Sequence, residues 1–242
     1  MRRSVGAVIP GAGMETAQRV IRRSGLFSRL LFVLWCLALL LLIYSLVRQN
    51  LPGGATRSWP WRLQLLDLQS AVAAVLATGG ASLAREQYAR TVKPLIGYFG
   101  RVTTEHGPHG QLAWVCHLFN GGQESAVMTD VSYWITYTDA GRDSGAADSS
   151  AWLTHSAAVA SIEKSGLVNR VDFALTASGA GHPLSAQTPR YMGWFTEKAM
   201  REVDNVFVRV RVLDRVGDAH ERVINLLKSA NRSPSHPDPP LL

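Results

Sequence analysis

The sequence predicts a protein of mixed class, membrane α plus all-β, in which a two-helix transmembrane hairpin is followed by an antiparallel β-sandwich. Three observations support this prediction: two long runs carry no charge, arginines flank these runs, and short β-prone runs fill the chain after Pro94. A small β-barrel is the runner-up for the β region. The expected divisions are a disordered basic segment at 1–24, two transmembrane helices within 25–94, a β-sandwich domain at 95–228 and a disordered tail at 229–242.

The first uncharged run, residues 30–47, reads LLFVLWCLALLLLIYSLV. Its 18 residues reach the length that a helix needs to cross the hydrocarbon layer, so we expect a transmembrane helix over about 30–48. A cleaved signal peptide is the alternative. However, the run is long for a signal core, it begins well inside the chain, and the following RQNLPGGATR offers no good cleavage site. An uncleaved span is therefore favoured.

The second uncharged run, residues 68–84, has 17 residues and reaches spanning length when the preceding Leu-Leu-Asp is included. We expect a transmembrane helix over about 65–84 that extends to about 92, because the residue before Pro94 disfavours helix. An amphipathic surface helix is the alternative, but its polar face would lack the usual Lys and Arg. Asp67 is expected to cap this helix at the interface rather than to relay protons.

Small residues recur along the second run at a four-residue spacing, which places them on one helix face. Such a face lets another backbone approach closely, as in membrane helix pairs. The leucine-rich first run, a partner protein or a second copy of the chain could supply the matching surface. This small-residue face consists of Ala73, Ala77, Gly80, Ala81 and Ala84. In the linker, Trp59 and Trp61 are expected to lie in the membrane interface.

The distribution of arginine predicts the orientation. Residues 1–29 contain six arginines, the linker contains three, and a further basic group follows the second run. This excess on both outer flanks predicts a multi-pass protein of the cell membrane with both termini in the cytoplasm. Cys36 lies in the first run and Cys116 is alone in the β region, so no disulfide can form there, which mildly favours a reducing compartment.

The net charge of +7 is unevenly distributed. Residues 1–94 hold twelve basic and three acidic residues, whereas residues 95–228 hold twelve basic and fourteen acidic residues. The positive charge therefore belongs to the segments that flank the membrane, where it sets topology and meets anionic lipid. The β region has no basic excess for a phosphate backbone, so we expect no nucleic-acid partner.

Short runs rich in β-branched and aromatic residues, separated by glycine-rich breaks, predict strands after Pro94. In the clearest of them the valines of 206–212 alternate with Phe207, Arg209 and Arg211, which is typical of a strand with one buried face. The other predicted strand regions are LIGYFGRV, QLAWVCHLF, AVMTDVSYWITYT, NRVDFALTA and HERVI. Asp214 and Gly217 supply the turn of a late hairpin.

Two further segments of the β region carry helix signals. Residues 156–167 predict a short helix with Gly166 as its stop. YMGWFTEKAMREVDN is equally compatible with a loop and a helical turn, so no structure is predicted there.

The search for chemistry finds no catalytic, cofactor-binding or metal site. Glu105, His106 and His109 in EHGPHG fit a plain hairpin loop better than a zinc site, which normally shows closed ligand spacing. Cys116 and His117 point to opposite faces of a strand, and Cys116 is expected to be a small buried hydrophobe. His155, His182 and His220 stand apart, and no nucleophile elbow, phosphate loop or dinucleotide fingerprint accompanies them.

The order of these segments resembles uncharacterised bacterial membrane proteins in which one or two N-terminal helices carry an immunoglobulin-like β domain. The resemblance covers about residues 30–228 and rests on VKPLI, LFNGGQESAVMTDVSY and VLDRVGDAHERV. Asn120, Gly121 and Gly122 with Ala126 look like an Asn-x-Gly turn before a strand, and Asp214 with Gly217 looks like an Asp-x-x-Gly hairpin. The resemblance implies an immunoglobulin-like fold and brings no catalytic residues.

Together these observations predict a non-enzymatic integral membrane protein. Its cytoplasmic β-sandwich is expected to bind another protein, as a subunit of a membrane assembly. The alternative is a ligand-sensing membrane effector, whose β domain binds a small molecule and whose helices oligomerise. The expected partners are the lipid bilayer and a protein or a second copy of the chain.

Overall fold

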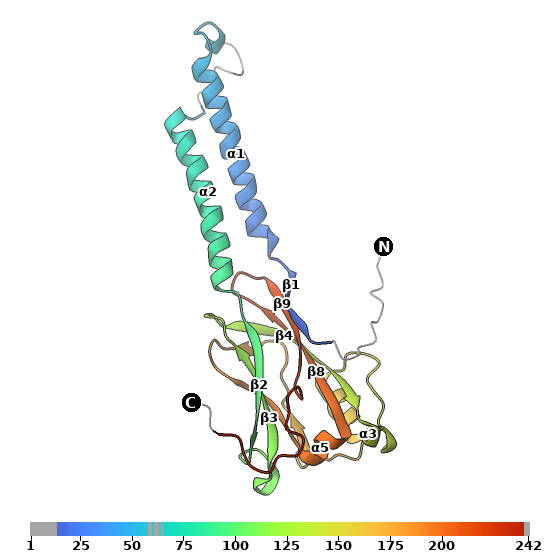
Figure 1. Cartoon of the computed structure of the whole chain (residues 1–242). Helices are drawn as coiled ribbons and strands as arrows, with labels where there is room; N and C mark the ends of the chain where they lie inside the picture. The colour runs from blue at the N-terminus through green and yellow to red at the C-terminus, as the bar shows by residue number, and fades with distance from the viewer. Residues whose placement is uncertain (1–13, 58–59, 61–62, 64, 240–242) are drawn as a thin grey trace. The chain divides into compact units, whose positions relative to one another are not determined.

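The computed structural model describes residues 14–57, 60, 63 and 65–239. The chain divides into two compact units, and one of them is built from residues on both sides of the other. The helical unit comprises residues 23–91, and the β unit combines residues 1–22 with 92–242. Figure 1 shows the two long helices of the helical unit in blue and cyan, and the sheets mainly in green to red. Each unit is described separately below.

The helical unit contains two long helices, α1 (Gly25–Asn50) and α2 (Leu68–Thr91), with a short 3-10 turn η1 (Ala55–Arg57) between them. The helices run antiparallel (Figure 1). At one end the Arg85 guanidinium donates to the Ser24 carbonyl at 3.2 Å. At the other end the Ser45 hydroxyl donates to the Leu66 carbonyl at 2.9 Å. The predicted stop before Pro94 is confirmed, because α2 ends at Thr91.

α1 is long and apolar enough to cross a membrane, and most of its apolar side chains are exposed. It is the one such helix among the described residues. α2 does not meet the same test, so the predicted two-helix transmembrane hairpin and multi-pass topology are not established by helix length and composition. α2 begins at Leu68 and not at the predicted Leu65. Its uncharged part before Arg85 is therefore only about 25 Å long, which is shorter than the hydrocarbon layer of a bilayer. The predicted interfacial tryptophans, Trp59 and Trp61, lie outside the described residues.

The face of α2 that contacts α1 is not the predicted small-residue face. Ala71 is fully buried, and a Cβ added at Gly79 would lie 3.6 Å from the indole nitrogen of Trp35 on α1. By contrast Ala73, Ala77, Gly80, Ala81 and Ala84 are all exposed. The expectation that the leucine-rich helix covers this face is thus wrong, because the two faces point in different directions around the same helix.

The β unit contains two antiparallel sheets in the described part of the chain. The larger sheet has the order β1-β9-β8-β4-β6, and the smaller sheet has the order β2-β3-β7-β5. The strands are β1 (Thr16–Arg22), β2 (Ile96–Thr103), β3 (Ala113–Asn120), β4 (Ala126–Tyr137), β5 (Phe173–Leu175), β6 (Pro183–Leu184), β7 (Arg190–Thr196), β8 (Val203–Leu213) and β9 (Ala219–Asn225). One buried apolar cluster takes side chains from both sheets, among them Leu118 of β3, Phe195 of β7 and Val208 of β8.

The alternation predicted for 206–212 is confirmed. All four valines of this stretch are fully buried, whereas Arg209 and Arg211 lie on the opposite face of β8. The predicted hairpin to β9 is also present. The Asp214 carboxylate accepts from the backbone N–H groups of Val216 and Asp218, and Gly217 has a φ of +84°.

The loops of the β unit contain short helices: η2 (Pro108–Gly110), α3 (Asp139–Asp143), α4 (His155–Glu163) and α5 (Glu197–Glu202). α4 is the helix predicted at 156–167. The Thr154 hydroxyl caps its start by accepting from the Ala157 N–H, and Gly166 follows its end with a φ of +79°. Residues 191–205, for which the sequence predicts no structure, form most of β7, then α5 and the start of β8.

The N-terminal segment requires a correction, because residues 16–22 lie in the segment 1–24 that the sequence predicts to be disordered. They form β1, which pairs antiparallel with β9. The Arg19 guanidinium donates to the Glu221 carboxylate at 2.6 Å, and the Gln18 side chain bonds the backbone of Pro94 and Ile96. These partners are far away in sequence, which explains why the local pattern of β1 gave no strand signal.

The tail requires a similar correction. The sequence predicts disorder for residues 229–239, but they pack on the β unit; 240–242 lie outside the described residues. The Arg232 guanidinium donates to the carbonyls of Met200, Val203 and Asp204. Asp238 bonds the backbone of Val102 in β2. Prolines prevent a regular strand here, but single anchoring contacts hold the tail without one.

Candidate functional site

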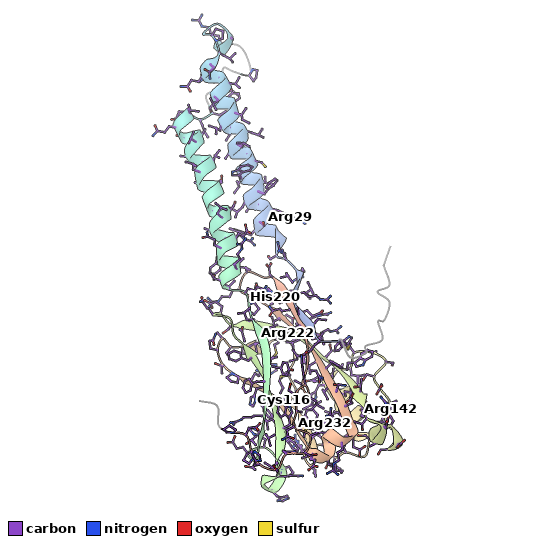
Figure 2. The ribbon with its side chains drawn as sticks, viewed as in Figure 1. Arg29, Cys116, Arg142, His220, Arg222 and Arg232 are labelled. Atoms are coloured by element: carbon purple, nitrogen blue, oxygen red, sulfur yellow. The ribbon has the colours of Figure 1, made fainter. Side chains whose placement is uncertain are left out.

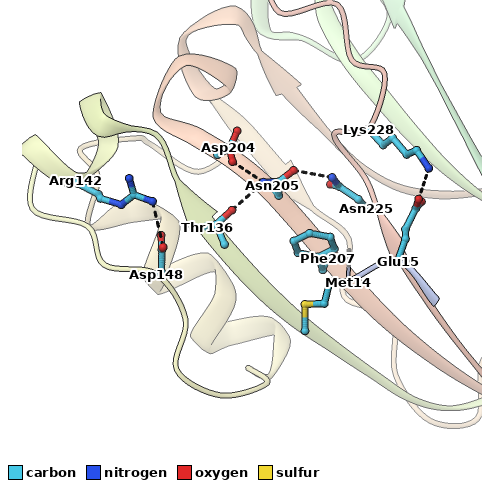
Figure 3. Close-up of a pocket in the computed structure, with 10 residues that line it drawn as sticks. All are labelled: Met14, Glu15, Thr136, Arg142, Asp148, Asp204, Asn205, Phe207, Asn225 and Lys228. Carbon is cyan, nitrogen blue, oxygen red and sulfur yellow. Dashed lines mark hydrogen bonds and ion pairs between the residues drawn. The ribbon is translucent and has the colours of Figure 1, made fainter. Parts of the chain in front are cut away.

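The outer face of the larger sheet carries a hollow of about 570 Å³. Strands β4, β8 and β9 form its floor, and the segments before β1 and after β9 form part of its rim (Figure 3). Its floor and rim are mostly polar. The ten lining residues are Met14, Glu15, Thr136, Arg142, Asp148, Asp204, Asn205, Phe207, Asn225 and Lys228. This is the candidate functional site of the β unit.

The floor of the hollow is a row of hydrogen-bonded side chains centred on Asn205. Its amide nitrogen donates to the Thr136 hydroxyl at 3.0 Å and to the Asp204 carboxylate at 2.5 Å (Figure 3). Its amide oxygen accepts from the Asn225 side chain at 2.7 Å. Strand register brings these residues together, because Thr136 is directly opposite Asn205. The hydrogen bonds of this row fix the orientation of the Asn205 and Asn225 side-chain amides.

Two ion pairs lie on the rim. The Arg142 guanidinium is 3.2 Å from the Asp148 carboxylate, and the Lys228 ammonium pairs with Glu15 (Figure 3). The Arg142 and Asp148 side chains are each nearly half exposed. Exposed pairs of this kind contribute little to stability, but they can exchange partners at low cost. The hollow can therefore accept a polar or charged group.

An aromatic cluster adjoins the hollow on the same face. Trp134, Phe207 and Val223 are buried together, with Trp152 packed against them. The Trp152 ring lies edge-on to Trp134 at 6.0 Å, and the Arg209 guanidinium lies 4.6 Å from its centre. Tryptophan and arginine beside a polar depression are the residue types that dominate the binding energy of protein interfaces.

A charged cluster continues this face toward the β8–β9 turn. The Glu221 carboxylate is 3 % exposed and lies 2.6 Å from Arg19 and 2.7 Å from Arg211. Burial raises the pKa of Glu221, but the hydrogen bonds from the two arginines lower it more, so the net pKa is below the ordinary value. The ion pairs of ionised Glu221 therefore stabilise the fold at pH values above the ordinary carboxyl pKa. This contribution to stability is lost as the pH falls through the lowered pKa of Glu221.

Glu105, His106 and His109 lie in or beside the loop between β2 and β3. Glu105 pairs with Arg101 at 3.5 Å, and the His106 ring stacks on Tyr191 at 4.9 Å. His109 has a φ of +53°, as suits a turn. Among the residues that the structure describes, no three His, Cys, Asp or Glu side chains gather as metal ligands would.

Cys116 and His117 point to opposite faces of β3, as predicted. Cys116 is fully buried, and its Sγ lies 3.2 Å from the Leu226 carbonyl. Burial raises the pKa of its thiol far above the ordinary value, so the thiol is protonated and a poor nucleophile. The His117 ring stacks on Phe99 at 5.0 Å. Burial, followed by the charges of His106 and Arg101, lowers its pKa.

The remaining candidate residues do not converge. The His155 ring contacts the Leu175 carbonyl, and His182 contacts the backbone of Gly179. His220 is buried and bonds the Asp214 carboxylate at 2.8 Å, so it supports the hairpin turn; Figure 2 shows its place on β9. In the helical unit, Asp67 precedes α2 and is hydrogen-bonded to the Ser70 side chain, in keeping with the predicted cap.

Sequence reasoning did not identify the hollow. The outward residues of β8, namely Asn205, Phe207, Arg209 and Arg211, could have indicated a functional face, because they combine amide, aromatic and guanidinium groups in one period-two series. No protein-family model matches this chain, and no curated protein matches it. The resemblance to bacterial membrane proteins with an immunoglobulin-like domain therefore still depends on the quoted motifs alone.

Proposed function

We propose that this chain is a non-enzymatic integral membrane protein whose β unit binds another protein. One observation carries the membrane part of the proposal: β1, which precedes α1, belongs to the same sheet as β9, near the other end of the chain. This pairing supports the proposal that the residues before and after the helical unit lie on one side of the bilayer. A chain that leaves this side through α1 has to return.

The return segment in this proposal is α2. It contacts α1 along its length in the antiparallel sense, and its uncharged part is only slightly shorter than a typical span. The Thr78 and Ser82 hydroxyls donate to the carbonyls of Ala74 and Thr78 on the same helix, which satisfies these polar groups without water. Tilting or local thinning of the bilayer accommodates the remaining mismatch.

The same pairing opposes cleavage of α1 as a signal peptide. Cleavage after the apolar run would remove β1 from the sheet and leave the buried Glu221 carboxylate without Arg19. The Glu221 carboxylate would then keep only one of its two guanidinium partners, Arg211.

The first prediction concerns topology. In intact cells, tags at the two termini are expected to give the same result with an impermeant labelling reagent, namely no labelling, because arginines on the outer flanks favour the cytoplasm for both. A cysteine introduced as Gly54→Cys between the helices is expected to be labelled. The control is the same assay after the cells are permeabilised, when all three positions should react.

Labelling of only one terminus would contradict the proposal, because it would mean a single crossing and a broken β1–β9 pair. Labelling of both termini in intact cells would retain two crossings and place the β unit outside.

The β unit is proposed to be a sandwich, with its two sheets packed face to face over the shared core. The candidate interface is the outer face of the larger sheet, where the hollow, the aromatic cluster and the Glu221 cluster adjoin. The partner is proposed to be a protein that inserts a polar or charged side chain into the hollow. The exposed small-residue face of α2 supports a second association, with another membrane helix or a second copy of the chain.

The second prediction tests this interface by photo-crosslinking in native membranes. A photoreactive residue at Arg142, on the rim of the hollow, is expected to yield one adduct of constant mass. The matched control is the same residue at Glu163, which is exposed on α4, and it is expected to yield none. Replacing Asn205 with alanine should reduce the adduct at Arg142 about tenfold, because it breaks the row of amides in the floor. Equal adducts at Arg142 and Glu163, or none at either, would contradict this interface.

A further inference from the structure

β2 is an edge strand, since only β3 pairs with it in the described smaller sheet. In an antiparallel pair, alternate residues direct their N–H and C=O groups away from the neighbouring strand. On β2 these residues are Ile96, Tyr98, Gly100 and Val102, because the N–H groups of Ile96 and Val102 bond atoms outside the sheet. An edge of this kind is a template for another strand.

Both ends of the β2 edge are occupied. At Ile96 the N–H donates to the Gln18 side chain at 2.8 Å, and the carbonyl accepts from the Arg222 guanidinium. At Val102 the N–H donates to the Asp238 carboxylate at 2.7 Å, and the carbonyl accepts from the Asp238 N–H at 2.9 Å. Asp238 thus reproduces both hydrogen bonds of a neighbouring strand residue.

The middle of the edge is different. No hydrogen bond from a described residue reaches the outward backbone groups of Tyr98 and Gly100. The tail cannot extend its pairing to them as a strand, because Pro237 and Pro239 flank Asp238 and lack an N–H. The tail therefore blocks the edge at one residue and leaves its centre unpaired.

We propose that residues 229–239 form a strap that prevents β2 from pairing with β2 of a second copy of this chain, and that release of the strap permits this pairing. The sequence GYFGR at 97–101 favours a second copy. In an antiparallel register centred on Phe99, the glycines at 97 and 100 would lie opposite the large side chains at 101 and 98 of the second copy. Tyr98 of each chain would exchange two hydrogen bonds with Gly100 of the other. Phe99 would face Phe99 of the second copy, a favourable cross-strand aromatic pair.

The strap and this dimer exclude each other. In the same register, Val102 of one chain would lie opposite Ile96 of the other, in the space that Asp238 occupies. Release of Asp238 is therefore required before the strands can meet, and Ile96 of each chain would then exchange Gln18 and Arg222 for Val102 of the second copy. The inference rests on the proposed function only in taking the β unit as a protein-binding module, and it does not depend on the number of membrane crossings.

The experiment uses the full chain in detergent with Cys36→Ala as background, because Cys116 is buried and protected. Phe99→Cys places a thiol on the two-fold axis of the expected dimer. Adding Asp238→Ala is expected to raise the fraction of disulfide-linked dimer about tenfold, since it removes the carboxylate and with it one of the two hydrogen bonds between the strap and Val102 of β2. Asp238→Asn, which keeps an acceptor and the N–H, should stay close to the unaltered chain.

Arg101→Cys is the control for register. It would face Gly97 of the second copy and should not form a disulfide with itself. A chain that ends at Lys228 removes the whole strap, including Arg232, and with Phe99→Cys it should cross-link at least as well as the Asp238→Ala variant. The proposal is overturned if neither strap variant increases cross-linking at position 99, or if position 101 cross-links equally. The topology assay is independent of both results, so the two proposals can fail separately.

Discussion

Replacing Asn120 with alanine is expected to lower the free energy of unfolding of the β unit by about 3–5 kcal/mol. Asn120 is fully buried at the end of β3. Its side-chain oxygen accepts from the N–H groups of Leu95 and Gly122, and its nitrogen donates to the carbonyls of Glu124 and Leu184. One side chain thus joins the start of β2, the following turn and β6. Alanine would leave the buried Gly122 N–H and the part-buried Leu95 N–H without this partner.

The measurement is urea unfolding of the full chain in detergent, followed by tryptophan fluorescence. Asn231→Ala is the matched control, because Asn231 is exposed and bonds only the neighbouring Ser233 N–H in the described tail. It should change stability by less than about 0.5 kcal/mol. A loss below about 1 kcal/mol for Asn120→Ala would show that water replaces the amide and that the side chain does not organise this region.

Replacing Gly193 with alanine is expected to be at least as damaging, with a loss of about 4 kcal/mol or more. Gly193 lies in β7 with a φ of +147°, which L-residues rarely adopt. A Cβ there would lie 2.1 Å from the Ala174 carbonyl oxygen of β5. Because the obstacle is backbone in a paired strand, it cannot rotate away. The substitution should therefore separate β5 from β7.

Gly181→Ala separates the cost of the clash from the cost of the backbone angle. Gly181 also has a positive φ, +89°, but an added Cβ would meet nothing within 4 Å. It should cost only about 1–2 kcal/mol. Hydrogen exchange should show faster exchange of β5 amides in the Gly193 variant alone. Similar losses for the two variants would mean that β5 moves aside without penalty.

Local pattern was sufficient for much of the fold. β3, β4, β8 and β9 each carry β-branched or aromatic residues between clear turn signals, and the alternation of β8 predicted its buried face. β7 was missed because five consecutive residues, 192–196, are buried, so no alternation is visible in RYMGWFT. β1 was missed because, in the described part of the chain, its one strand partner is β9, and local sequence contains no information about so distant a neighbour.

The candidate site was less accessible to sequence reasoning than the fold. Thr136, Asn205 and Asn225 belong to three strands, and only the register across β4, β8 and β9 places their amide and hydroxyl groups in one row. The rim adds Glu15 from before β1 and Lys228 from after β9. Such a site is defined by pairing rather than by a motif. The sequence therefore did not indicate where the candidate site would form.

The pairing of β1 with β9 also constrains the order of events during synthesis. Arg19 and Glu221 are separated by 202 positions, so β1 leaves the ribosome long before its partner strand exists. Both hydrophobic helices emerge in the interval. β1 must stay unpaired until β9 has been made, so the larger sheet closes only when translation is nearly complete. Slow translation of β8 and β9 should therefore prolong the time for which β4 and β1 lack these strand partners.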